Sequence, residues 1–308
     1  MVHFIGFKTH QSVQHLIFLI LFMVYCVTIC GNLLIITLVS YGKTLHSPMY
    51  FFLSQLSLSD ILIVTDILPN TLHAVLVEEA MISFSGCIIQ FYFFAVSEVL
   101  QCFLLTAMAF DRYLAICKPL HYTLIMSHQV CWMIVTTFWI LSMLIELIFA
   151  LRISKLQFCG PNIVDHFFCD FHPIVDLSCF DTTSVELEVN LVGAVVVVIP
   201  FTVIIVSYIY IIVTIFNIPS ITGRQKVFST CSSHLTVVSI YYGTMVCVYL
   251  VPSRGQSLNV SKLLPLLYTV VTPLMNPIIY SLRNKDLKKV IGNLVNFLNL
   301  QFRKNKCS

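Results

Sequence analysis

Seven long apolar segments dominate this chain of 308 residues. Each is long enough to cross the roughly 30 Å hydrocarbon core of a bilayer as a helix, and the stretch 189–223, for example, contains no Asp, Glu, Lys or Arg. A span inside hydrocarbon must satisfy its own backbone hydrogen bonds, so each segment is expected to be helical. The predicted spans are 16–40, 48–76, 87–117, 130–151, 187–214, 227–251 and 263–282. The sequence therefore predicts an all-α, seven-helix membrane domain that occupies residues 1–308.

The composition supports the same conclusion, because 58% of the residues are hydrophobic and 10% are charged. A soluble domain carries about 25% charged residues, so the lipid bilayer is the expected surroundings of this chain. A net charge of +3 does not argue for a nucleic-acid partner. No cleavable signal peptide is recognised at the start. Pro200, Pro273 and Pro277 fall inside the fifth and seventh spans, where they predict kinks.

The distribution of Lys and Arg predicts the orientation in the membrane. One side would hold Lys43, Lys118, Arg224, Lys226, Arg283, Lys285, Lys288, Lys289, Arg303, Lys304 and Lys306, and the other side Lys8, Arg152, Lys155, Arg254 and Lys262. Because basic residues favour the cytosolic side, the N-terminus is expected outside and the C-terminus in the cytosol. After the seventh span, residues 284–297 predict an amphipathic helix that lies on the anionic inner leaflet.

Six motifs follow one another along the chain, each in or beside its own span. They are GN at 31–32, PMYFFLSQLSLSD at 48–60, MAFDRYLAIC at 108–117, SY at 207–208, KVFSTCSSHL at 226–235 and PLMNPIIYSLRN at 273–284. With these motifs the chain resembles rhodopsin-like G-protein-coupled receptors, and within that class the vertebrate odorant receptors. The resemblance covers nearly the whole length. It implies a receptor, not an enzyme, that needs no cofactor, binds a small volatile odorant, and activates a stimulatory heterotrimeric G protein to raise cyclic AMP.

The triplet Asp111, Arg112 and Tyr113 ends the third span, where ions at the edge of hydrocarbon usually mark function. The resemblance implies that Arg112 pairs with Asp111 at rest and meets the G protein when the sixth helix moves outward. It also implies further members of this activation switch, namely Tyr208, Tyr242, Asn276, Pro277 and Tyr280. The alternative is a salt bridge that only anchors the end of the helix.

A second polar set lies inside otherwise apolar spans, where an unpaired polar group is costly. The resemblance places Asn32, Asp60 and Gln101 together with Asn276 and Pro277 in a buried cluster. Odorant receptors usually carry Glu at the position of Gln101, and without that second acid a bound sodium ion is doubtful. Plain hydrogen bonding between helices is the alternative role for this set.

The ligand cavity is expected, by resemblance, between the third, fifth, sixth and seventh helices. Its predicted lining is mostly apolar and comprises Phe94, Ala95, Glu98, Val99, Val192, Val196, Met245, Tyr249 and Thr269. Such a lining suits a small volatile held by burial and one or two polar groups. Glu98 shares one stripe of the third helix with Phe94, Gln101 and Leu105. Two interpretations of Glu98 stay open: an anchor for a cationic or hydrogen-bonding odorant, or a protonated structural group.

Four cysteines are expected outside the membrane, at Cys87, Cys159, Cys169 and Cys179. An even number in an extracellular setting favours disulfides, and four cysteines allow three pairings. The resemblance implies Cys87–Cys169 and Cys159–Cys179. The rival hypothesis is a metal site that uses His166, His172 and nearby cysteines; because oxidised cysteines cannot ligate in this way, no metal is predicted.

Other classes of function fit the sequence less well. A transporter or channel would usually show internal repeats or broken helices at the midplane. An intramembrane enzyme would need a convergent set of groups, whereas Asp60, Asp66, Glu98 and Glu146 are scattered over three spans. A receptor for a small amine or lipid is the nearest rival, because Glu98 suits an amine.

Glycosylation is the remaining departure from the resemblance. Residues 1–15 contain no Asn-x-Ser/Thr sequon, and the outer sequon at Asn259 lies close to the membrane. The segment before the first span is also shorter than expected, which predicts a truncated chain or one that reaches the cell surface poorly.

Overall fold

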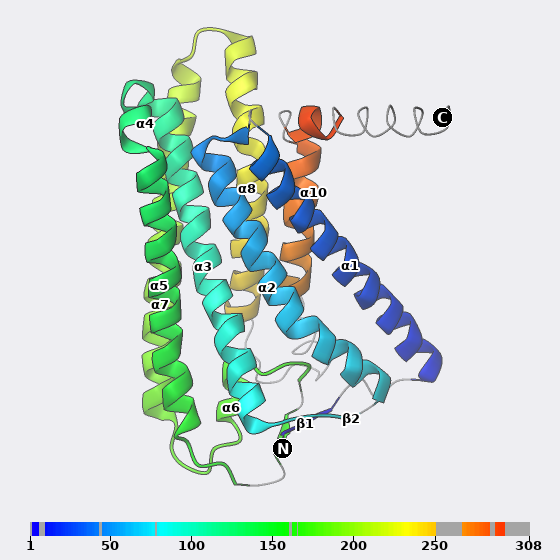
Figure 1. Cartoon of the computed structure of the whole chain (residues 1–308). Coiled ribbons are helices and arrows are strands. Elements are labelled where there is room, and N and C mark those ends of the chain that lie inside the picture. The colour runs from blue at the N-terminus through cyan, green and yellow to red at the C-terminus, as the bar shows by residue number, and fades with distance from the viewer. Residues whose placement is uncertain are drawn as a thin grey trace, which may run out of the picture.

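A computed structural model describes residues 2–5, 10–42, 45–77, 79–159, 162–164, 166–250, 267–283 and 287–292. Its long helices are α1 (Gln11–Tyr41), α2 (Pro48–Val77), α3 (Phe84–Cys117), α5 (His128–Ser154), α7 (Thr183–Asn217) and α8 (Ile221–Leu250). The last span consists of a π-helical turn, η2 (Leu267–Val271), followed by α10 (Thr272–Arg283). Together they form the predicted seven-helix bundle (Figure 1).

Helix α3 lies at the centre of the bundle, in contact with α2, α5, α7 and α8. Side chains on several of its faces are consequently buried, among them the consecutive residues Leu100, Gln101 and Cys102, which are 0%, 1% and 1% exposed. Helix α1 packs against α2 and α10. A polar group placed on α3 therefore has partners on several helices within reach.

The outward faces of the helices are apolar, as a bilayer requires. Leu16 on α1, Met133 on α5 and Val198 on α7 are 57%, 62% and 58% exposed. Hydrophobic surface of this extent is unusual on a soluble monomer. By length and composition, α1, α2, α3, α5 and α7 are each suited to crossing a membrane. The chain is a multi-pass membrane protein.

A three-stranded sheet at one end of the bundle was not predicted by the sequence analysis. It consists of β1 (Val2–Ile5), β2 (Glu79–Ile82) and β3 (Ile163–Val164), in the order β2-β1-β3 (Figure 1). Strand β1 pairs antiparallel with β2, with His3 opposite Met81, and parallel with β3, with Phe4 opposite Val164. We call this end the sheet end.

The opposite end carries the short helix α4 (Pro119–Ile125), and we call it the α4 end (Figure 1). A second short helix, α6 (Phe171–Val175), lies at the sheet end. Residues 287–292 are also helical, with Leu287 buried. The rest of the predicted amphipathic helix 284–297, and the sequon at Asn259, lie outside the described residues.

The prolines correct one expectation about kinks. Pro200 and Pro277 lie inside α7 and α10, as predicted, and Pro69 lies inside α2. Pro273 instead occupies the second position of α10, after the π-helical turn. The first turn of an α-helix tolerates proline, because its N–H groups have no partner within the helix.

Candidate functional site

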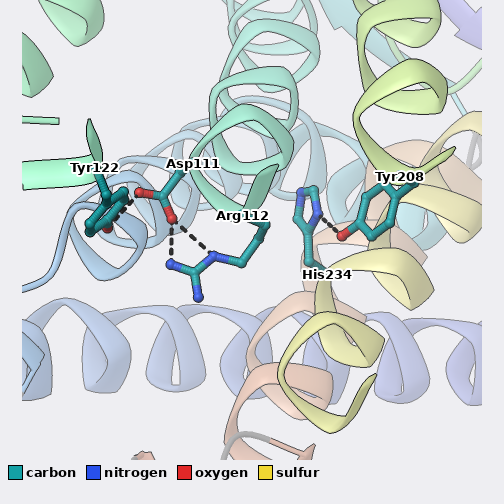
Figure 2. A network of polar contacts seen from close by, with 5 residues as sticks. All are labelled: Asp111, Arg112, Tyr122, Tyr208 and His234. Atoms are coloured by element: carbon teal, nitrogen blue, oxygen red, sulfur yellow. Dashed lines mark hydrogen bonds and ion pairs between the residues drawn. The ribbon is translucent and has the colours of Figure 1, made fainter. Parts of the chain in front are cut away.

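At the α4 end, the side chain of Asp111 is fully buried and both of its oxygens accept hydrogen bonds. Arg112 donates from Nε to Asp111 Oδ2 at 2.9 Å, and from Nη2 to the same oxygen. The hydroxyl of Tyr122, on α4, donates to Asp111 Oδ1 at 2.9 Å (Figure 2). Burial, and then the charge of Asp111, raise the pKa of Tyr122 above its ordinary value, which keeps the hydroxyl a donor. The ion pair thus holds the guanidinium of Arg112 against the end of its own helix.

A second contact on the other side of Arg112 joins α7 to α8. The hydroxyl of Tyr208 lies 2.6 Å from Nδ1 of His234, and both side chains are buried (Figure 2). Tyr280 on α10 is also fully buried, and among the described residues its hydroxyl has no partner. The predicted tyrosines therefore face the interior. The sequence analysis missed His234, although this residue lies within the motif at 226–235.

The remaining members of the predicted switch lie apart from this contact. Tyr113 is partly buried and faces Tyr210 of α7, with ring centroids 5.7 Å apart. Tyr242 is buried in α8, where its ring lies 4.7 Å from that of Phe201. Both tyrosines therefore belong to contacts between helices, and neither approaches the carboxylate of Asp111 in a hydrogen bond.

Asp60 organises the buried polar cluster near the middle of the bundle. Gln101 Nε2 donates to Asp60 Oδ1 at 2.9 Å, and Asn276 Nδ2 donates to Asp60 Oδ2 at 2.8 Å. All three side chains are buried, so α2, α3 and α10 are joined through one carboxylate. The amide of Gln101 supplies a donor where a second acid would repel Asp60. The described residues contain no group of three or more His, Cys, Asp or Glu side chains that could hold a metal ion.

Asn32 does not join this cluster directly. Its amide donates to the carbonyl of Thr28 at 3.0 Å and to the carbonyl of Pro273 at 3.2 Å. In an α-helix, the N–H of residue 277 would bond that second carbonyl, but Pro277 has no N–H. Asn32 thus replaces the missing donor from a neighbouring helix. Gly31 permits the close approach, because a Cβ there would lie 3.0 Å from Cβ of Pro277.

Glu98 is buried at a junction between α3 and α8. The hydroxyl of Tyr241 lies 3.0 Å from the backbone oxygen of Glu98 and 3.3 Å from its Oε2. The same hydroxyl lies 3.1 Å from Sγ of Cys102. We call Glu98, Cys102 and Tyr241 the α3–α8 junction. Sequence analysis selected Glu98 but missed Tyr241, since nothing in its apolar surroundings distinguishes it from a packing residue.

The other predicted ligand residues are distributed over several packing clusters. Phe94 packs edge-on against Phe168, with ring centroids 5.2 Å apart. Ala95 and Val192 contact the core at the sheet end, while Met245 belongs to the central core. Buried positions on α3, α7 and η2 are taken by Val99, Val196 and Thr269. The side chain of Tyr249 lies outside the described residues.

Two disulfides lie at the sheet end, in the pairing that the resemblance implies. Cys87 is bonded to Cys169 and Cys159 to Cys179, with Cα–Cα distances of 5.4 and 5.5 Å. Gln90 strengthens the first link, because its Oε1 accepts from the backbone N–H of Cys169 at 3.0 Å. The segment around Cys169 is thereby fixed to the first turns of α3.

The histidines proposed as metal ligands instead pack against aromatic rings. The ring of His166 lies edge-on to Phe168, with centroids 4.7 Å apart. The ring of His172 is edge-on to Phe171. All four cysteines of this region are oxidised, so the arrangement gives no support to a metal site.

Comparison with known proteins gives matches over most of the chain. A family model described as olfactory receptor matches residues 21–297. Olfactory receptor 1468 of Rattus norvegicus is 43% identical over 287 residues, which cover 93% of this chain and 91% of the relative. Olfactory receptor 11L1 of Homo sapiens is 44% identical over 291 residues, covering 94% and 90%. Among solved structures, squid rhodopsin superimposes with a TM-score of 0.71 at 16% identity, over 95% of this chain and 88% of that one.

Proposed function

Because this chain belongs to the olfactory receptor family, we propose that it binds small volatile odorants between its helices and activates a stimulatory heterotrimeric G protein, which raises cyclic AMP. The observation that carries the proposal is the likeness to olfactory receptors over more than nine-tenths of the chain. The buried ion pair at the α4 end supports it, since coupling needs an element with two states.

The ion pair between Asp111 and Arg112 is the proposed coupling element. In the closed state, which is the one that the structure has, the guanidinium of Arg112 is paired with the carboxylate of Asp111. When α8 moves outward, the contact between Tyr208 and His234 separates and Arg112 becomes available to the C-terminal helix of the G protein. A helix C-terminus presents unsatisfied carbonyls, which a permanent cation suits. Odorant favours the open state only to the extent that it binds that state more tightly.

The proposed ligand site lies on the sheet-end side of Asp60. Glu98 supplies a polar anchor, and the predicted lining around it is apolar apart from Thr269 and Tyr249. Burial of the apolar part of a volatile provides most of the affinity at about 25 cal/mol per Å². The disulfide between Cys87 and Cys169 would hold the segment around Cys169 in place over this site.

The proposed orientation places the α4 end in the cytosol. Lys118 directly precedes α4, and Lys288 and Lys289 are exposed beyond α10, whereas the sheet end carries the disulfides. Basic residues on the inner side and oxidised cysteines on the outer side support the same topology. The chain is accordingly proposed to reside in the plasma membrane.

The direct experiment exposes cells that express this chain to a panel of volatiles and measures cyclic AMP. We expect a concentration-dependent rise for at least one chemical class, absent from cells with empty vector. Surface labelling in the same cells separates a silent receptor from one that is not displayed. A displayed receptor that answers no volatile, but answers a peptide or a water-soluble amine, would contradict the odorant assignment.

A further inference from the structure

The hydroxyl of Tyr241 has more acceptors than protons. It lies within hydrogen-bond distance of two acceptors, the backbone oxygen and the carboxylate oxygen Oε2 of Glu98, and of the sulfur of Cys102, which can either donate or accept. A phenol has one proton to donate. Tyr241 is 0% exposed, so no solvent water at its hydroxyl replaces the hydrogen bonds that its single proton cannot make. The junction therefore has alternative hydrogen-bond arrangements of similar geometry.

The carboxylate of Glu98 is incompletely satisfied. Its Oε1 is buried and has no hydrogen-bond partner among the described residues, while the side chain as a whole is 8% exposed. The ion pairs within the described part of the chain join Arg112 to Asp111 and Arg152 to Glu188. Among the described residues, no Lys or Arg forms an ion pair with Glu98. A buried carboxylate with an open oxygen is costly, and a cationic or donating group at that oxygen would offset the cost.

From this geometry we propose that the α3–α8 junction is a ligand-opened contact whose ligand class is the small apolar amine. This inference rests on the proposed function and names the odorant class for that site. The ammonium group binds Oε1 of Glu98 and turns the carboxylate away from Tyr241. Tyr241 then donates its single proton to the backbone oxygen of Glu98 or pairs with Cys102. Because a hydrogen bond to a carboxylate is stronger than one to a neutral acceptor, the contact between α3 and α8 weakens and α8 moves more readily.

The hydroxyl of Tyr241 is necessary to the proposal, whereas its ring is not. A phenylalanine at this position would fill the same space in the core but make none of the three polar contacts. Removing one hydrogen bond between α3 and α8 favours the open state by a net factor of about two to ten. The junction therefore stabilises the resting state until the amine binds.

Two substitutions test the proposal in the full-length receptor, with cyclic AMP and surface level measured together. The probes are straight-chain amines from pentyl to octyl and the alcohols of the same chain length. For Glu98→Gln, we expect the amines to lose about ten- to hundredfold in potency, with little change for the alcohols. For Tyr241→Phe, we expect basal cyclic AMP to rise about two- to tenfold at equal surface level. The amine-to-alcohol potency ratio should be retained in Tyr241→Phe.

Matched controls make the same chemical changes elsewhere. Glu146→Gln alters a buried acid of α5, and Tyr92→Phe removes an exposed hydroxyl that lies 3.4 Å from the carbonyl of Met143. Neither control should change the amine preference or the basal level. Equal potency losses for amines and alcohols in Glu98→Gln would return Glu98 to a structural role, and an unchanged basal level in Tyr241→Phe would overturn the junction. A parent receptor that answers neutral volatiles but no amine refutes this inference while leaving the odorant assignment intact.

Discussion

Tyr122 donates its hydroxyl to Asp111 across the boundary between α4 and α3, at 2.9 Å. Because Arg112 already occupies the other oxygen of Asp111, the carboxylate has a partner on each side. The closed state at this end is consequently a three-residue network rather than an isolated ion pair. It also joins α4 to the ion pair at the end of α3.

Replacing Tyr122 with Phe should destabilise the resting receptor. The change leaves Oδ1 of the buried Asp111 without its partner, which costs about 1–3 kcal/mol. We expect a lower melting temperature for purified receptor in detergent. Tyr92→Phe, which removes a long and exposed hydroxyl contact, serves as the control and should melt as the parent does. Indistinguishable melting of the two variants would show that Tyr122 contributes nothing to the network.

Arg112→Ala should abolish odorant-dependent cyclic AMP while the receptor still reaches the surface. The substitution removes the permanent cation proposed to meet the G protein. Arg152→Ala is the matched control, because Arg152 forms an exposed ion pair with Glu188 at 3.2 Å. Exposed pairs contribute about 1 kcal/mol or less, so this control should signal like the parent. Normal signalling by a surface-displayed Arg112→Ala receptor would rule out the coupling mechanism.

Loss of the Cys87–Cys169 disulfide should cost more stability than loss of Cys159–Cys179. The first closes a loop with a sequence separation of 82 and the second one of 20, and longer closed loops are stabilised more in the chain-entropy model. For Cys87→Ser with Cys169→Ser we expect a loss of about 2–5 kcal/mol and a lower surface level. Cys26→Ser, at an exposed free cysteine, is the control. A larger loss from the Cys159–Cys179 pair would contradict the ranking.

Gly31→Ala should be destabilising, although alanine favours helices. Its Cβ would lie 3.0 Å from Cβ of Pro277, whose ring cannot rotate away. Overpacking of this kind costs about 1–3 kcal/mol. At Gly193 on α7, an added Cβ meets nothing within 4 Å, so Gly193→Ala should be neutral or stabilising by up to about 1 kcal/mol. Thermal melting of both variants measures the difference, and equal melting temperatures would refute the close contact.

The bundle could be predicted from the sequence because its cause is local. A long apolar span must satisfy its own backbone hydrogen bonds in lipid and therefore forms a helix, and α7 (Thr183–Asn217) covers the span expected at 187–214. The partnership of Asp60 and Gln101 was expected from the family resemblance, which places both residues in one buried cluster.

Other features depend on tertiary contacts that leave no periodic pattern. Strand β1 consists of four residues, and its partners β2 and β3 lie far along the chain. Tyr241 precedes Tyr242 directly, and the polar role of its hydroxyl follows only from the positions of Glu98 and Cys102 on another helix. The sequence shows a tyrosine there but not what it contacts.

The bond from Asn32 to the carbonyl of Pro273 provides a fixed frame for measuring receptor motion. A side chain of α1 donates to the backbone carbonyl that Pro277 cannot reach with an N–H of its own. We therefore expect α1 to travel with that segment of α10. Spin labels placed on the outer faces of these two helices should keep one separation in the resting and agonist-bound receptor. That constant distance between the two labels would serve as the internal reference for measuring a displacement of α8.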